Sequence, residues 1–286
     1  MQASAFLKLL LLLPVAFFEL ANGAGDWNYL ANGKDWGHLC STGKLQSPIS
    51  LDISTAVKKA IPRVWFGHHT QELSRPLIIK NNGHTIHLDI PMTIKGRQPF
   101  IAGGRLSGRY HAVGLHIHWG SKNSAGSEHS LKRFRYDAEV HIVCYSEKYK
   151  DIVEAVQHKG GIAVAAIFLA ADKTGRTHIH GLSKLVDASA RTPIYESNAT
   201  IPGSYSLNDM IGNANLEQFY SYDGSLTTPD CRESVIWNVF SKAVLVSFEG
   251  FARLWKLRDH WGKRLINNFR TVQALNNRTV YYRTKR

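Results

Sequence analysis

Hydrophobic and polar residues alternate along the chain in short blocks separated by turn residues. The blocks are rich in β-branched and aromatic residues, and Asn-Gly, Gly-Gly or Asp-Gly pairs bound them, which is typical of a sheet. Six strands are predicted, at 76–80, 85–90, 114–119, 138–145, 162–169 and 235–240, and three short helices, at 151–157, 182–190 and 251–257. No repeat or linker interrupts this pattern. It therefore predicts one mostly β (α+β) domain, built on a large, central, twisted mixed sheet that is mainly antiparallel and has short peripheral helices.

The only long apolar run lies at the start of the chain. Lys8 precedes an apolar stretch at 9–18, and small residues follow at 21–23. This stretch is too short to cross a bilayer, and Pro14 interrupts it. We interpret residues 1–23 as a secretory signal peptide and 24–286 as the mature domain with a basic C-terminal tail. No apolar stretch closes the C-terminus, so we expect a secreted, extracellular protein with no membrane span.

Secretion changes how the three cysteines are interpreted, because an oxidising compartment allows one disulfide bond among them. Cys144 lies in a β-branched and aromatic run typical of a packed strand, whereas Cys40 and Cys231 lie among Gly, Ser, Thr and Pro. We expect a disulfide between Cys40 and Cys231 and a buried Cys144. The sequons at Asn198 and Asn277 fit the same compartment as candidate glycosylation sites.

The formal net charge of +13 raises the question of an anionic partner. Ten basic residues and one acid, Asp259, lie between residue 251 and the end of the chain. They form either a solvated helix face and loop, or a surface that docks onto an anionic extracellular matrix or polysaccharide. Nucleic acid is not expected as a partner after secretion and without interleaved aromatic residues. A secreted, basic, matrix-binding protein with low catalytic output is therefore one candidate function.

Two histidines on one predicted strand are candidate metal ligands. Side chains repeat every two residues along a strand, so His116 and His118 project from the same face. His141 lies on the next predicted strand, and Glu139 falls on its face, where a carboxylate can hold the outer nitrogen of a ligating imidazole. Three histidines without a fourth protein ligand would describe a catalytic zinc site. The spacing alone does not bring the two strands together, and ordinary packed histidines are the alternative.

Several short motifs, in a consistent order, carry a family resemblance. They are Leu115-His116-Ile117-His118-Trp119-Gly120, Ser127-Glu128-His129, Glu139-Val140-His141, Gly224-Ser225-Leu226-Thr227-Thr228-Pro229, Gln46-Ser47-Pro48 and Asn81-Asn82-Gly83-His84. Over about residues 27–278 the chain resembles the α-class carbonic anhydrases of the secreted, single-disulfide type. The resemblance implies reversible hydration of carbon dioxide to bicarbonate and a proton, with Zn²⁺ held by His116, His118 and His141. It also implies a weak esterase side activity.

The resemblance assigns further roles to individual residues. Thr227 is expected to orient the attacking oxygen and to donate a hydrogen bond to an ionised Glu128, while Glu139 orients His141. His84 matches the residue that carries the proton to bulk solvent. The residues expected to line the carbon dioxide pocket are Val143, Val164, Leu226, Thr228 and Trp237, and those expected to order the water chain to His84 are Tyr29, Asn82 and His87.

The chain departs from the family pattern at two places. Gly114 stands where many members have a glutamine that holds the outer nitrogen of His116, so another group must hold this ligand or it is less firmly held. Phe269-Arg270-Thr271 replaces the common Trp-Arg-Pro, a change that we interpret as structural.

Overall fold

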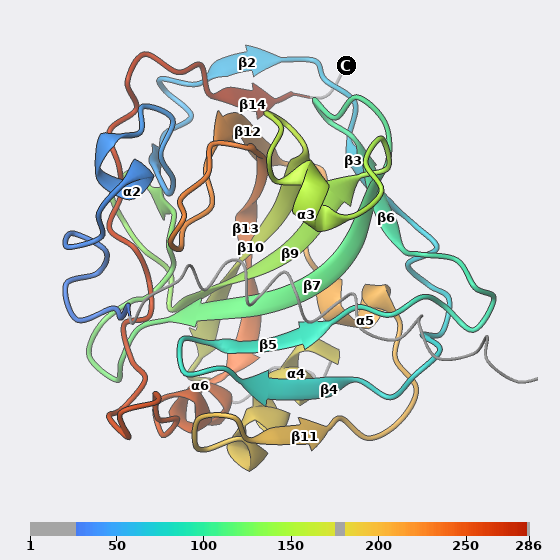
Figure 1. Cartoon of the computed structure of the whole chain (residues 1–286), viewed down its shortest axis with the longest axis vertical. Helices are drawn as coiled ribbons and strands as arrows, with labels where there is room; N and C mark the ends of the chain where they lie inside the picture. Colours follow the sequence, from blue (N-terminus) through green and yellow to red (C-terminus); the bar gives the residue numbers. More distant parts are fainter. Residues whose placement is uncertain (1–26, 175–180, 285–286) are drawn as a thin grey trace, which may run out of the picture.

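A curved, twelve-stranded β-sheet runs through the centre of the protein in the computed structural model, which describes residues 27–174 and 181–284 (Figure 1). The predicted signal peptide lies outside these ranges. In sheet order the strands are β11 (Asn198–Thr200), β4 (Ile78–Asn81), β5 (Ile86–Asp89), β7 (Tyr110–Trp119), β9 (Ala138–Ser146), β10 (Ile162–Asp172), β13 (Val235–Ser247), β12 (Phe219–Gly224), β14 (Tyr281–Arg283) and β2 (Val57–Lys59). Off this path, β6 (Phe100–Gly103) pairs with β7 and with β3 (Val64–Gly67), while β1 (Ser50–Leu51) and β8 (Ser130–Leu131) form a separate pair.

The sheet is mixed and mainly antiparallel, as predicted. The parallel pairs are β10 with β13 and β14 with β2 within the sheet, and β1 with β8 outside it. All six predicted strands are present, as β4, β5, β7, β9, β10 and β13. β7 begins four residues before the predicted start, at Tyr110, because the register shifts between Ala112 and Gly114 and breaks the alternation by which a strand is recognised.

The helices are short and lie around the sheet. They are α2 (Leu39–Thr42), α3 (Ile152–Ala155), α4 (Gly181–Ala188), the 3₁₀ helix η1 (Ser189–Arg191), α5 (Leu207–Ile211) and α6 (Phe248–Leu254). The third predicted helix begins three residues early, at Phe248, because the Ser247 hydroxyl accepts the N–H of Gly250 and caps it there. Among the described residues, no helix is long and apolar enough to span a bilayer.

Both faces of the central sheet are buried, each in a different hydrophobic cluster. Leu115 and Ile117 of β7 belong to the larger cluster, together with side chains of α4 and α6. Val143, Val164 and Trp237, from β9, β10 and β13, belong to the smaller cluster on the opposite face. Side chains on either face of β9, β10 and β13 are therefore tightly packed. This packing restricts the orientation of any polar side chain on these strands.

The C-terminal segment runs along one side of the sheet, next to the N-terminal segment, and ends in β14 (Figure 1). The Thr271 N–H donates to the carbonyl of Asn32, and the Gln273 N–H donates to that of Pro48. The side chain of Arg270 is buried and donates to the carbonyls of Cys40 and Ser47. Up to Arg283, the basic segment is thus part of the packed fold.

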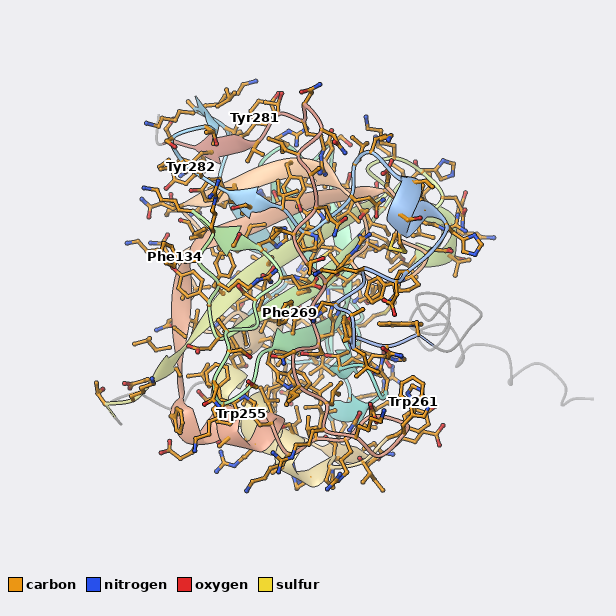
Figure 2. All side chains as sticks on the ribbon, turned by 90° about the vertical axis from the view of Figure 1, so that its left-hand side faces the viewer. Phe134, Trp255, Trp261, Phe269, Tyr281 and Tyr282 are labelled. Carbon is orange, nitrogen blue, oxygen red and sulfur yellow. A yellow bond between two sulfur atoms is a disulfide. The ribbon has the colours of Figure 1, made fainter. Side chains whose placement is uncertain are left out.

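The covalent and aromatic contacts at this side of the molecule agree with the sequence. The predicted disulfide between Cys40 and Cys231 is formed, and Cys144 is free and buried. Figure 2 shows Phe269 in the middle of this face, where the Arg135 guanidinium lies 4.4 Å from the centre of its ring. The aromatic residue at this position therefore takes part in a structural cation–π contact.

Candidate metal centre

Three histidines of two neighbouring strands converge in the middle of the sheet. His116 and His118 lie on β7, and His141 of β9 is directly opposite His116 in the antiparallel register. One ring nitrogen from each lies within 4.8 Å of those of the other two, and His141 Nδ1 is 3.2 Å from His116 Nε2. The strand pairing therefore supplies the proximity that sequence spacing could not establish.

Hydrogen bonds at the outer nitrogens fix the orientation of two of these rings. His118 Nδ1 lies 2.8 Å from the carbonyl oxygen of Asn268, and His141 Nε2 lies 2.8 Å from Glu139 Oε1. Because a carbonyl and a carboxylate only accept, each bonded nitrogen carries the proton. His118 Nε2 and His141 Nδ1 are then left with lone pairs directed at the cluster. His118 Nε2 is buried and has no hydrogen-bond partner among the described residues.

The electrostatics of the cluster favour metal-binding protonation states. Burial lowers the pKa of His118, and burial together with the two neighbouring imidazoles lowers the pKa of His116 well below its usual value. Both rings are therefore neutral, which is the form that binds metal ions. Burial would raise the pKa of Glu139, but contacts with His129 and His141 outweigh it and hold that pKa well below the usual range. This donor set fits Zn²⁺ with an open coordination position.

A buried hydrogen-bonded chain supports the cluster, and its members behind Glu139 have no role predicted from the sequence. Glu139 accepts from His129 twice, from the backbone N–H at 2.8 Å and from Nδ1 at 2.7 Å. His129 Nε2 lies 2.7 Å from the hydroxyl of Tyr222, which donates to Ser47 Oγ. His129 stands in one of the quoted motifs, but its partners lie on β9, β12 and the N-terminal segment, so no local spacing indicates this role.

His116 has a polar neighbour on the strand at its other side. His87 of β5 is its register partner, opposite His141 of β9. His87 is buried and is not among the residues that line the cavity in front of the cluster. The structure therefore places His87 beside a candidate ligand, and its role in the water path stays a prediction. Gly114, which stands where many family members have a glutamine, lies two residues before His116 on β7.

The cluster lies at the inner end of a cavity of about 580 Å³, counting the part open to solvent. Its wall contains every residue expected to form the carbon dioxide pocket: Val143, Val164, Leu226, Thr228 and Trp237. They come from β9, β10, β13 and the loop between β12 and β13. Three strands and one loop thus form a mostly apolar surface beside the three histidines.

Thr227 and Glu128 approach the same cavity, although they do not form the expected contact. Glu128 is fully buried, and its Oε1 accepts the backbone N–H of Arg270 at 2.8 Å. Its Oε2 lies 3.5 Å from His118 Nε2 and has no hydrogen-bond partner among the residues described. Thr227 lines the cavity. The hydrogen bond from the Thr227 hydroxyl to Glu128 is therefore absent from this structure, and an acceptor for it is present.

His84 lies at the outer part of the cavity, with Tyr29 and Asn82 also in the wall. Its ring stacks on Trp27 at a centroid separation of 3.8 Å, and its Nε2 lies 2.8 Å from the Trp27 carbonyl oxygen. Burial lowers the pKa of His84, and the Trp27 contact opposes this effect. Asn82 also shapes the turn, because its side-chain oxygen accepts the N–H groups of His84 and Thr85.

Both sequon asparagines are exposed. Asn198 begins the edge strand β11, and Asn277 lies in the turn before β14. Neither position is covered by the described part of the chain, so each is accessible to a modifying enzyme.

Comparison with known proteins points to one family. The profile described as eukaryotic-type carbonic anhydrase matches residues 31–284. Carbonic anhydrase 6 of Homo sapiens is 33% identical, over 94% of this chain and 88% of the relative. Putative carbonic anhydrase 5 of Caenorhabditis elegans is 31% identical, over 97% and 89%. Carbonic anhydrase 12 of Homo sapiens is 30% identical, over 98% and 79%.

Proposed function

This chain belongs to the eukaryotic-type carbonic anhydrases, and on that premise we propose that it hydrates carbon dioxide reversibly at a Zn²⁺ ion held by His116, His118 and His141. The observation that carries the proposal is the convergence of these three ring nitrogens in an apolar cavity. When bound, zinc supplies a Lewis acid that activates a water molecule, and the bound-water pKa of about 7 is an established value for this family rather than a consequence of this structure.

The chain's own residues keep the ligands in place. Asn268 and Glu139 hold the outer nitrogens of His118 and His141, so the inner nitrogens stay deprotonated and directed at the metal position. Glu139 is itself held by His129, so the support extends two residues behind the ligand. This arrangement reduces the freedom of the imidazoles to rotate away from the metal.

Thr227 and Glu128 would orient the reacting oxygen. We assign the free Oε2 of Glu128 as the acceptor for the Thr227 hydroxyl, which then presents its own lone pair to the cavity. Carbon dioxide is apolar, and it is accommodated by the wall formed by Val143, Val164, Leu226, Thr228 and Trp237. The same site would hydrolyse activated esters weakly.

His84 would carry the product proton out of the cavity. Since its Nε2 donates to the Trp27 carbonyl, the lone pair of the neutral ring is on Nδ1, and this atom accepts the proton. A lowered pKa helps the resulting imidazolium to release the proton at neutral pH. Burial, reinforced by the charge of Glu128, raises the pKa of Tyr29 well above its usual value, so this phenol stays protonated beside the water path.

The decisive experiment is stopped-flow carbon dioxide hydration by the full chain, with zinc content measured on the same sample. We expect about one zinc per chain and measurable turnover. His118→Ala should lose the zinc and lower kcat/KM by roughly 100-fold or more, because one of three ligands is removed. His158→Ala is the matched control, since this exposed histidine stacks on Tyr149 outside the cavity. Full activity in His118→Ala would refute the proposed site.

The shuttle role of His84 has a separate test. His84→Ala should lower kcat in weak buffer while kcat/KM stays near the wild-type value, because proton export and the hydration step are different events. Added imidazole should restore kcat by carrying the proton in place of the side chain. An unchanged kcat in His84→Ala would assign proton export to another group.

Secretion and glycosylation remain part of this proposal. The Cys40–Cys231 disulfide is consistent with folding in an oxidising compartment, and the exposed Asn198 and Asn277 are accessible to glycan transfer. Expression in a secreting cell, followed by N-terminal sequencing and glycosidase treatment, tests these assignments together. A mature chain that retains residues 1–23 would contradict the signal peptide.

The second candidate function is binding to an anionic matrix, and the structure leaves only some of the basic residues exposed for it. Five arginines of the basic segment donate side-chain hydrogen bonds within the described structure: Arg253, Arg258, Arg270, Arg278 and Arg283. The exposed cations in its described part are Lys256, Arg258, Lys263 and Arg264. Truncation would remove β14, so substitution of Lys256, Lys263 and Arg264 by Gln is the sharper test. The control variant carries Gln at Lys95, Lys122 and Lys150, which lie outside this segment. If the first variant elutes from heparin at a lower salt concentration than the control, docking by this segment is supported. Elution of both at the same salt concentration would refute it.

A further inference from the structure

His84 lies between two hollows of the molecule. One is the cavity in front of the three histidines, and the other is a hollow of about 790 Å³ on its outer side, again counting space open to solvent. We call the second one the outer hollow; it is lined by Asn28, Leu30, Asn32, Gly83 and the residues Asp259, Trp261, Arg264, Leu265, Ile266 and Asn267. Tyr29 and His84 line both spaces. A group at this position can therefore take a proton from one hollow and release it towards the other.

A second histidine lies next to His84, between Asp259 and Trp261, which line the outer hollow although the histidine itself does not. His260 follows Asp259 in the turn after α6, and its ring centroid is 5.6 Å from that of His84, with an angle of 47° between the ring planes. At this separation, two imidazoles can exchange a proton directly or through one water molecule. Trp261, the next residue, is exposed and labelled near the edge of the molecule in Figure 2, which marks where this turn reaches solvent.

Each of the two rings has a nitrogen that is available for transfer. His84 Nδ1 and His260 Nε2 are both buried, and neither has a hydrogen-bond partner within residues 27–174 and 181–284. His84 Nε2 is bonded to the Trp27 carbonyl, so the proton must enter and leave this ring at Nδ1 unless the ring turns. Buried nitrogens without partners are costly, and two of them on adjacent histidines indicate a function.

The backbone permits this close approach because residue 83 has no side chain. A Cβ at Gly83 would lie 3.3 Å from His260 Nδ1 and 3.0 Å from the Tyr195 ring, and its φ of +83° also favours glycine. Tyr195 also packs against His260, with a ring centroid 5.9 Å from that of the histidine. His260 is thus packed against the turn that carries His84.

The loop that carries His260 is held in place by hydrogen bonds to Asp259. His84 from the β4–β5 turn and Tyr195 from the segment before β11 make ring contacts with His260, and the same loop carries three exposed cations, Arg258, Lys263 and Arg264. The Asp259 carboxylate is occupied by the N–H groups of Trp261 and Lys263. The turn is therefore fixed by its own hydrogen bonds, which holds His260 at its position beside His84.

We propose that His260 is the second step of a two-histidine proton relay, which receives the proton from His84 and releases it to solvent at the turn that carries Trp261. The N–H bond at Nδ1 of the His84 imidazolium breaks, and a new N–H bond forms on His260, directly or through one water molecule. His84 returns to its neutral form, and His260 then protonates water or a buffer base. No electrons are transferred. This inference rests on the proposed role of His84 as the shuttle.

The test compares His260→Gln with the wild type in the full, zinc-loaded chain. Glutamine keeps the size and polarity of the side chain but cannot carry a proton near neutral pH. We expect kcat in weak buffer to fall roughly threefold or more, less than the ~10²-fold typical of a group that transfers protons in the chemical step itself. The value of kcat/KM should stay unchanged, and imidazole buffer should restore kcat. His158→Gln, an exposed histidine outside both hollows, should match the wild type.

Two further measurements separate a relay from a structural role. In an NMR titration, the pKa of His84 should rise in His260→Gln, because His260 lowers it in the wild type. In His84→Ala, the added His260→Gln change should lower kcat no further, since the relay is already interrupted.

Each adverse result has a distinct meaning. A wild-type kcat in His260→Gln, while His84→Ala is impaired, would overturn the relay and leave the shuttle intact. A parallel fall of kcat and kcat/KM in His260→Gln would also overturn the relay, because it would indicate a structural role. A wild-type chain without carbon dioxide hydration would instead refute the proposed function itself.

Discussion

Glu139 links the candidate metal centre to the buried structure behind it. Its carboxylate is fully buried and accepts hydrogen bonds from His141 and, twice, from His129. Burial alone would favour the protonated acid, but the two histidines outweigh that effect and hold the pKa of Glu139 far below its usual value. An ionised carboxylate at this position keeps the proton of His141 on Nε2 and the lone pair on Nδ1.

Glu139→Gln should therefore weaken metal binding more than it weakens folding. The amide keeps the shape of the side chain but can no longer fix the tautomer of His141, so we expect zinc affinity to fall roughly 10–100-fold. Competition with a chelator of known affinity measures this loss. Glu154→Gln is the control, because Glu154 lies on α3, outside the metal centre. Equal zinc affinity in Glu139→Gln and the wild type would show that the carboxylate is not needed to orient the ligand.

His87 should make the folded protein sensitive to acid. Burial, with a smaller contribution from Lys80, lowers its pKa to about 4, whereas an unfolded chain has a histidine pKa of about 6.5. Between these values the unfolded state binds the proton and the folded state does not, so stability falls as the pH falls from 6.5 to 4. The full effect is about 3 kcal/mol. Urea unfolding of His87→Gln should show a correspondingly smaller loss over this pH range, and identical pH profiles would contradict the assignment.

At the scale of elements, the connection between β7 and β9 decides where Glu128 lies. This loop folds back so tightly that Gly120 and Gly126 face each other. A Cβ on Gly126 would lie 1.7 Å from the backbone nitrogen of Gly120, and a Cβ on Gly120 would lie 1.9 Å from the Ser124 carbonyl oxygen. Both contacts are with backbone atoms, so no side-chain rotation can relieve them. Glu128 follows two residues after this crossing.

Gly126→Ala should therefore destabilise the fold and disturb the site together. We expect a loss of about 3 kcal/mol or more in the free energy of unfolding, because the backbone has to move to admit the methyl group. Gly37→Ala is the matched control: a Cβ at Gly37 meets no atom within 4 Å, so its effect should stay within about 0.5 kcal/mol. Urea unfolding measures both, and equal effects would show that the loop can relax.

At the scale of the whole molecule, two segments near the ends of the chain complete the site. The disulfide joins Cys40 to Cys231 across 191 residues, and the Cys231 N–H donates to the Thr228 carbonyl in the loop that carries Thr227. Arg270 of the C-terminal segment donates its backbone N–H to Glu128 and its guanidinium to the Cys40 carbonyl. The orientation of Thr227 and Glu128 therefore depends on both segments being in place.

The double substitution Cys40→Ser with Cys231→Ser should lower the free energy of unfolding by about 3–5 kcal/mol, because the disulfide closes a very long loop in the unfolded chain. Urea unfolding with and without reductant tests this expectation. Reductant should lower the midpoint of the wild type to that of the variant and should leave the variant unchanged. Coinciding wild-type and variant curves without reductant would contradict it.

Periodicity predicted the central strands well, because β4, β5, β7, β9, β10 and β13 combine β-branched residues with turn pairs at their ends. The strand period also placed His116 and His118 on one face and Leu115 and Ile117 on the other, as the structure has them. Helix boundaries were less accurate, because α6 begins at a serine cap rather than at the first residue of an apolar repeat.

The sequence alone determined which residues the chain has available for metal chemistry, because strand geometry is local and each motif is contiguous. The tertiary structure decided which of them meet. The register of β7 against β9 sets His141 opposite His116, the long loops bring His129, Asn268 and Arg270 behind the ligands, and His87 lies beside His116 instead of in the cavity wall. These contacts join residues that are far apart in the chain, and such pairs leave no periodic signal in the sequence. The position of His260 next to His84 is a contact of the same kind.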